Sequence, residues 1–111
     1  MGSPADARMR ERFWRPVMVP LDLKLLHGPV RGEVTLPRRL YWSGDMTFDL
    51  NDAYWRGRLL EIVLREALRV DDVEEYVDDA ELRRQWGELR LPPYVREAWE
   101  AAHPDLAACR A

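Results

Sequence analysis

The hydrophobic and polar positions in the first third of the chain do not repeat at a helical period. Prolines stand at positions 16, 20, 29 and 37 and glycines at 28 and 32, so no long helix fits and any strand must be short. The apolar runs predict strands at residues 17–19, 33–36 and 40–42. Residues 21–26 fit either a strand or a helical turn, and residues 27–32 are expected to form a loop.

Short aromatic runs flank the Ser-Gly-Asp sequence at residues 43–45 and predict a β-hairpin. In this hairpin, residues 40–42 would pair with residues 46–48 across the turn. Because side chains alternate along a strand, one face of the hairpin would be apolar, and we expect it to be buried. That face would carry Leu40, Trp42, Met46, Phe48 and Leu50.

From Asn51 onward the apolar positions repeat about every 3.6 residues, which predicts a helix running to about Leu68. Asn51 or Asp52 can cap its first turn. Gly57 costs about 1 kcal/mol relative to alanine inside a helix, and we expect it to mark close packing against the hairpin. The side expected to be buried carries Trp55, Leu59, Ile62, Val63 and Ala67.

Two Asp-x-x-Glu runs, at residues 71–74 and 78–81, each combine a capping side chain with an acid in the first turn, as is typical of a helix start. A last helix is predicted from Pro93 to Pro104. Together these patterns predict an α+β fold, with a small N-terminal antiparallel sheet followed by about four short helices. The helical residues expected to face inward are Val73, Tyr76, Val77, Leu82, Trp86, Val95, Ala98, Trp99 and Ala102.

Length and composition favour a single domain, because 111 residues are too few for two stable cores. We expect a flexible arm at residues 1–12, one α+β domain at 13–104 and a flexible tail at 105–111. The content of 47% apolar and 33% charged residues is typical of a soluble globular protein. The chain has no apolar run of about 20 residues and no secretion signal at its start. We therefore predict a cytoplasmic protein without membrane contact.

The net charge of −3 is unevenly distributed. Residues 1–44 carry eight Lys and Arg against four Asp and Glu, while residues 45–111 carry nine against sixteen. This polarity can steer a partner or pair the chain with a second copy of itself, or it can be neutralised within one compact domain. Arginine excess alone is no evidence for phosphate binding, because a GC-rich codon bias explains sixteen arginines beside one lysine.

No catalytic or metal-binding motif is recognisable. The two histidines, His27 and His103, stand apart, and Cys109 is the only cysteine. The serines lie in no nucleophile elbow and the glycines form no phosphate loop. General acid–base work requires a buried acid, and spacing assigns the acids of the helical region to caps and the surface. These acids are Asp71, Asp72, Glu74, Glu75, Asp78, Asp79 and Glu81. We therefore expect no enzymatic activity, no cofactor and no metal.

The arginines interleaved with aromatic residues at positions 38–58 are the best candidate binding surface. Most of the five tryptophans should lie in the core, but an exposed aromatic ring beside arginines is a typical hot spot for a protein partner. The candidate partner-binding residues are Arg38, Arg39, Tyr41, Arg56 and Arg58. A protein partner or a homodimer is therefore expected.

Nucleic acid is the alternative partner, bound through the arginines of residues 8–15 together with Arg38 and Arg39. Two features oppose it. The C-terminal half is acidic, and the predicted helix at residues 79–86 carries acids at the end that would approach DNA. The sequence thus favours a protein partner over nucleic acid.

Three segments in this order, LPRRLYWSGDMTFDLND, LLEIVLREALRVDDVEEYVD and LRLPPYVREAWE, resemble a family of small bacterial proteins, most of them uncharacterised. The resemblance covers roughly residues 36–104. Some of these proteins look like accessory partners of nucleotidyltransferase-type toxin systems, so the resemblance implies an antitoxin-like interaction role. It assigns no binding residue, because the shared motifs are mostly structural.

Overall fold

The structure is a computed structural model, which describes residues 16–41 and 47–110. The predicted flexible arm at residues 1–12 lies outside the described residues, as do Trp42 and Met46 of the predicted hairpin. In the described ranges, no helix combines the length and the apolar character needed to cross a membrane.

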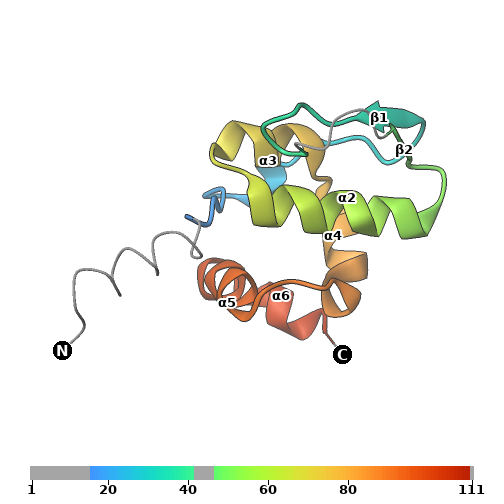
Figure 1. The fold of residues 1–111 in the computed structure, drawn as a ribbon. Coiled ribbons are helices and arrows are strands. Elements are labelled where there is room, and N and C mark those ends of the chain that lie inside the picture. Colours follow the sequence, from blue (N-terminus) through green and yellow to red (C-terminus); the bar gives the residue numbers. More distant parts are fainter. Residues whose placement is uncertain (1–15, 42–46, 111) are drawn as a thin grey trace.

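Helices dominate the fold, and one antiparallel pair of strands accompanies them, which confirms the predicted α+β class (Figure 1). Helix α2 crosses the middle of the molecule, with the sheet and α3 on one side and α5 and α6 on the other (Figure 1). The elements are the 3-10 helix η1 (Leu23–Leu25), β1 (Glu33–Thr35), β2 (Thr47–Asp49), α2 (Ala53–Glu66), α3 (Val70–Tyr76), α4 (Asp79–Gln85), the 3-10 helix η2 (Trp86–Glu88), α5 (Pro93–Ala102) and α6 (Asp105–Ala108).

The sheet pairs different segments from those that the sequence predicted. Strand β2 pairs with β1, with Val34 opposite Phe48, and not with Leu40 and Tyr41. Within that predicted strand, Leu40 and Tyr41 belong to a tight turn, because both of their backbone N–H groups donate to the carbonyl of Pro37. Residues 17–19 form no strand either, while residues 23–25 adopt the helical turn that was one of two alternatives. Leu40 is nonetheless buried, as predicted, but it enters the core from the turn.

Helix α2 begins as its sequence predicts, since the side chain of Asp52 accepts a hydrogen bond from the N–H of Tyr54. It ends at Glu66, two residues before the predicted end. Its middle is buried on almost every side, from Leu59 to Leu64. Gly57 does mark a close approach, but the neighbour is α4: a Cβ at this position would lie 2.5 Å from Oε1 of Gln85.

The later helices largely follow their predicted starts. Asp78 caps α4 by accepting from the N–H of Glu81, and Pro93 is the first residue of α5. Helix α3 starts at Val70, before the predicted run at residues 71–74, and its N-cap residue Arg69 makes no side-chain capping bond. Ala102, expected inside, is exposed at the end of α5.

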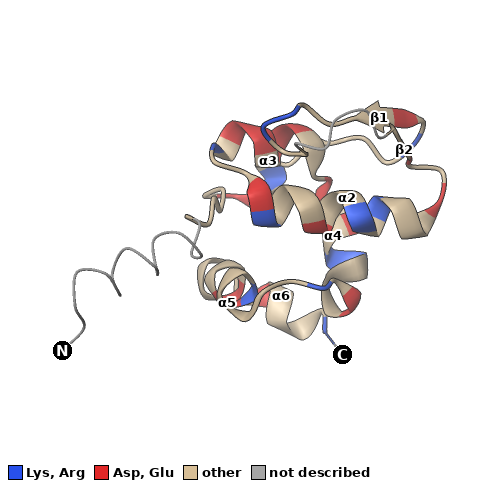
Figure 2. Ribbon diagram, viewed as in Figure 1, with Lys and Arg blue, Asp and Glu red and all other residues tan. Residues whose placement is uncertain are grey.

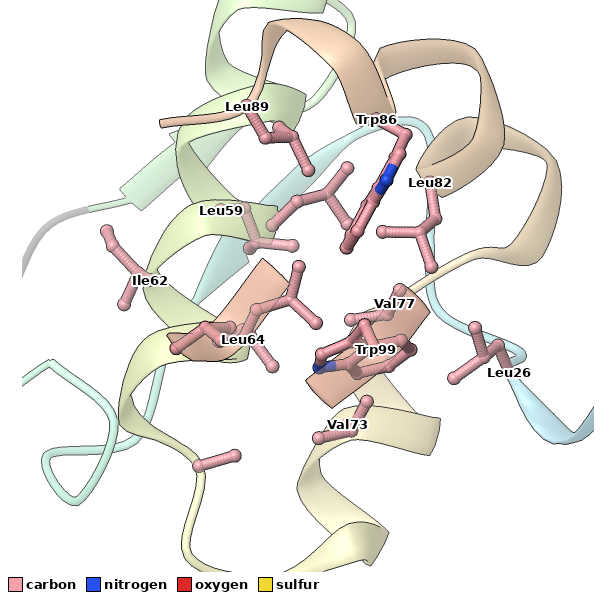
Figure 3. Packing of buried hydrophobic residues seen from close by; sticks show 14 of the residues in the cluster. Leu26, Leu59, Ile62, Leu64, Val73, Val77, Leu82, Trp86, Leu89 and Trp99 are labelled. Atoms are coloured by element: carbon pink, nitrogen blue, oxygen red, sulfur yellow. The ribbon is translucent and has the colours of Figure 1, made fainter. Parts of the chain in front are cut away.

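The core is one continuous apolar cluster centred on two tryptophans (Figure 3). Trp86 and Trp99 are fully buried, with ring centroids 6.3 Å apart. Figure 3 shows Leu59 of α2 and Leu82 of α4 beside them. Arg96 lies 4.9 Å above the Trp86 ring and donates to the carbonyls of Trp86 and Leu89, so it also holds the end of η2.

Both ends of the described chain are fastened to this core. The carbonyl of Pro20 accepts from Nε2 of His103, at 2.8 Å. Residues 105–110 are not the flexible tail that was expected, because α6 buries Leu106 completely and Arg110 pairs with Glu100. An isolated leucine among alanines gives a weak pattern in sequence. Burial of one leucine contributes about 1.5 to 3 kcal/mol, and the ion pairs of Asp105 with Arg83 and of Arg110 with Glu100 add to it.

Candidate functional site

The five predicted binding residues do not form one surface. Arg38, Arg39 and Tyr41 lie in the turn at residues 37–41, next to the acidic helix α3, whereas Arg56 and Arg58 lie on α2 (Figure 2). Two of the three buried acids, Asp72 and Glu81, lie on the helices after α2, and the third is Glu61 of α2 itself. Each of these acids is paired with at least one of the predicted arginines.

Asp72 is the centre of the first cluster. Its side chain is 1% exposed. Arg39 donates to it through Nε (3.1 Å to Oδ2) and Nη2 (2.7 Å to Oδ1), and Nη2 of Arg69 lies 3.1 Å from Oδ1. The hydrogen bonds from Arg39, and after them that from Arg69, hold the pKa of Asp72 below its usual range even though burial raises it. The sequence placed Asp72 at the surface, which is wrong.

A hollow of about 260 Å³ opens beside this cluster. It is lined by Arg39, Leu40, Leu68, Arg69 and Asp72, and we call it the Leu68 hollow. Leu68 is 54% exposed, so its side chain is an accessible apolar wall of the hollow. The side chains of Arg39 and Arg69 are 47% and 58% exposed. The hollow therefore combines apolar walls with two cations and one buried anion.

The other two predicted residues of this turn differ from each other. Tyr41 is half-buried, and its ring meets that of Phe48 edge-on at 5.9 Å between centroids. Such a contact is typical of core packing. Arg38 is exposed beside Arg39. Of the turn residues, the two arginines are therefore accessible to a partner, while Tyr41 packs its ring against Phe48.

Glu81 is the centre of the second cluster, with a side chain that is 4% exposed. It accepts from Arg84 and Gln85. Arg56 Nε lies 3.0 Å from Oε2 of Glu81, close enough for an ion pair but outside the geometry of a directed hydrogen bond. Burial raises the pKa of Glu81, but Gln85 and Arg56 outweigh burial, so this pKa lies below its usual range. The surface position predicted for Glu81 is wrong.

Arg56 also contacts the residue that follows β2, because its Nη1 donates to the carbonyl of Leu50 at 2.8 Å. Arg58 pairs within α2: its Nη1 lies 2.9 Å from Oε1 of Glu61. The other oxygen of Glu61 accepts from the backbone N–H of Arg90 at 2.6 Å. Arg56 and Arg58 thus have structural contacts that the sequence pattern did not reveal.

These contacts border a cleft of about 550 Å³ between α2, α4 and η2. We call it the arginine cleft, because Arg56, Arg58, Arg84 and Arg90 line it together with Glu61, Glu81 and Glu88. Figure 2 marks the basic positions of α2 and α4 in blue along the ribbon. Among the residues that the structure describes, no group of three His, Cys, Asp or Glu side chains is placed to hold a metal ion.

The sequence pattern did not reveal the ion pairs of these clusters, although three of the pairs have a helical spacing. Arg69 and Asp72, Arg58 and Glu61, and Glu81 and Arg84 are each three residues apart, so they share a helix face. That spacing predicts pairing on one helix but gives no sign of burial. Burial comes from the turn at residues 37–41 and from Arg56, which lie far away in sequence.

No family model, curated protein or solved structure matches this chain. The resemblance to small bacterial accessory proteins stays a prediction.

Proposed function

We propose that this chain is a non-enzymatic interaction protein, and that its Leu68 hollow binds a segment of a partner protein that presents an apolar side chain next to acidic residues. The observation that carries the proposal is the half-exposed Leu68 at a hollow whose two flanking arginines are held in place by a buried carboxylate. An antitoxin-like accessory role in the cytoplasm, as the sequence suggests, is the finer form of this proposal.

The shape and charge of the hollow match such a segment. Apolar anchors that fill pockets contribute most of the affinity at protein interfaces, and Leu40 and Leu68 provide apolar walls. Two cations of the lining, Arg39 and Arg69, share the single lining anion Asp72, which leaves a positive excess for an acidic partner.

The arginines are also preorganised. Asp72 holds Arg39 through two hydrogen bonds and Arg69 through one, so each guanidinium has already lost part of its conformational freedom in the free protein. A partner carboxylate then binds with a smaller entropic cost. Five N–H donors per arginine leave several for the partner after these bonds are made.

The buried acids favour a binding role over acid–base catalysis. A general acid or base works best with a pKa near the operating pH. The pKa values of Asp72 and Glu81 are shifted the opposite way, below their usual range, by the groups that hydrogen-bond to them. Both carboxylates therefore stay charged at neutral pH and serve to hold arginines.

Nucleic acid remains the alternative partner. Asp72 neutralises part of the charge of Arg39, which weakens the predicted pair of Arg38 and Arg39 as a phosphate site. The arginines of residues 8–15 lie outside the described residues. A mobility-shift assay at low salt with single- and double-stranded DNA tests this alternative, and we expect no shift.

Selection of peptides from a random display library against the immobilised full chain tests the proposal. We expect enriched peptides to combine acidic and large apolar residues, and we expect Leu68→Ala to weaken their binding about tenfold, as loss of part of one buried leucine implies. Leu25→Ala is the matched control, since Leu25 is 49% exposed but lies in η1. Enriched peptides that bind both variants equally well would contradict the proposal.

A second copy of the chain is the competing occupant. Sedimentation velocity over a range of protein concentrations separates the two cases. We expect a monomer, in wild type and in Leu68→Ala alike. A wild-type dimer that Leu68→Ala converts to monomer would instead place a second copy in the hollow and would overturn the assignment to a separate partner.

A further inference from the structure

We propose that the arginine cleft is a separate binding site for a small oxyanion, a phosphate monoester or a carboxylate carried on a flat ring. The cleft lies between α2, α4 and η2 and shares no lining residue with the Leu68 hollow. Its volume of about 550 Å³ falls within the range of about 300 to 1,000 Å³ that is typical of small-molecule sites.

The buried carboxylates of the cleft hold its arginines in place. Glu61 and Glu81, with side chains 8% and 4% exposed, lie behind the surface. Glu61 pairs with Arg58, and Glu81 pairs with Arg84. The side chains of these two arginines remain 40% and 67% exposed, so each is held by one end and offers its other N–H groups to a ligand. A fixed planar guanidinium is the group best suited to bind a carboxylate or phosphate through two hydrogen bonds.

The charge balance selects an anion over a cation. Four arginines face three glutamates around the cleft. Both oxygens of Glu61 and both oxygens of Glu81 already accept hydrogen bonds, so neither carboxylate is available to a cationic ligand. Arg90 is exposed, and its guanidinium forms no ion pair with any described residue. Arg56, Arg58 and Arg84 stand against Glu61 and Glu81, and Arg90 stands against Glu88, so the lining keeps an excess of one positive charge.

Tyr54 adds a flat surface to the same cleft. Its side chain is 62% exposed, and its ring is fixed edge-on against Trp55, with 4.9 Å between centroids. An exposed, fixed aromatic ring stacks on another ring at low entropic cost. A ligand that carries both a ring and an oxyanion would therefore contact Tyr54 and the arginines together.

Isothermal titration calorimetry of the full chain with phenyl phosphate, benzoate and inorganic phosphate, at matched ionic strength, tests this proposal. We expect saturable binding of at least one ring-bearing anion and weaker binding of inorganic phosphate. Tighter binding of phenyl phosphate would assign the site to phosphate monoesters, and tighter binding of benzoate to carboxylates. No saturable binding of either would overturn the proposal.

Three arginine variants separate the cleft from general surface charge. Arg90→Ala removes the exposed cation without breaking a side-chain bond among the described residues, so it should fold normally. We expect Arg90→Ala and Arg84→Ala each to weaken binding about fivefold or more, the effect of losing one hydrogen bond to a charged group. Arg65→Ala, on α2 but outside the cleft lining, should leave binding unchanged. Equal weakening in all three variants would show binding by net charge alone and would overturn the proposal.

This inference does not depend on the Leu68 hollow. Leu68→Ala should leave oxyanion binding unchanged, and Arg90→Ala should leave peptide binding unchanged. The two binding measurements therefore test the Leu68 hollow and the arginine cleft independently.

Discussion

Replacing Asp72 with asparagine removes the carboxylate that holds the turn at residues 37–41 against α3. Asparagine keeps the size of the side chain but loses its charge. Three hydrogen bonds from Arg39 and Arg69 are weakened or lost. A hydrogen bond to a charged group contributes about 1.5 to 3 kcal/mol when it is buried. Because both arginines are about half exposed, solvent screens part of this energy. We expect Asp72→Asn to lower the free energy of unfolding by about 2 to 3 kcal/mol at pH 7.

Urea denaturation followed by tryptophan fluorescence measures this loss, and a pH series identifies its cause. The pKa of Asp72 is lowered in the folded state, so the stability that Asp72 contributes is present above its ordinary pKa of 3.8 and is lost as the pH falls further. We therefore expect the difference between wild type and Asp72→Asn to shrink below about pH 3.8.

Asp71→Asn is the matched control, because Asp71 is the neighbouring acid in the same first turn of α3 but is exposed. We expect it to cost about 0.5 kcal/mol or less, mainly through its interaction with the helix dipole. Equal losses for the two variants, or a difference that does not change at low pH, would refute the role assigned to the Asp72 ion pairs.

Three further substitutions test the backbone at two glycines and the ion pair of the C-terminal segment. Gly28→Ala should destabilise the fold by about 3 kcal/mol or more, because the new Cβ would lie 2.3 Å from the backbone of Tyr76. Gly32→Ala should cost only about 1 kcal/mol, because position 32 meets open space but has a φ of 79°. Thermal melts should show the larger loss of stability for Gly28→Ala. Arg110→Ala removes the main cause of the lowered pKa of Glu100, which is about 2 in the folded protein. The wild type should lose the folding stability contributed by ionised Glu100 as the pH falls from about 4.5 toward 2. Thermal melts across this range should show a smaller loss of stability in Arg110→Ala. An identical pH dependence of the two proteins would contradict the pairing of Arg110 with Glu100.

The helical half of the fold follows from local sequence signals. The cap at Asp52, the cap at Asp78 and the first-turn proline Pro93 each act within a few residues, so the sequence shows them directly. The apolar period then identifies Leu59, Ile62 and Val63 of α2 and Leu82 of α4 as buried.

The strand pairing could not be read in the same way. The aromatic run at residues 40–42 looks like a strand, but the carbonyl of Pro37 captures the N–H groups of Leu40 and Tyr41 and closes a turn. Strand β2 then pairs with β1, across a longer connection than a hairpin would need. Turn formation and strand formation compete for the same N–H groups, and a local pattern does not decide between them.

The candidate site depends on contacts between distant residues, which is why the acids were misplaced. Asp71 and Asp72 are equivalent in local sequence, yet only Asp72 is buried, because Arg39 reaches it from a turn 33 residues earlier. The candidate binding arginines at positions 38–58 are likewise divided between two clusters.

Nuclear magnetic resonance mapping with a ¹⁵N-labelled chain and a peptide enriched by display tests the central claim most directly, namely that the Leu68 hollow is the partner site. We expect the largest amide and arginine Nε–H shift changes at residues 37–41 and 67–72, with little change at Leu25 or around the arginine cleft. Changes concentrated elsewhere, with the signals of Leu68 and Arg39 unmoved, would contradict the claim.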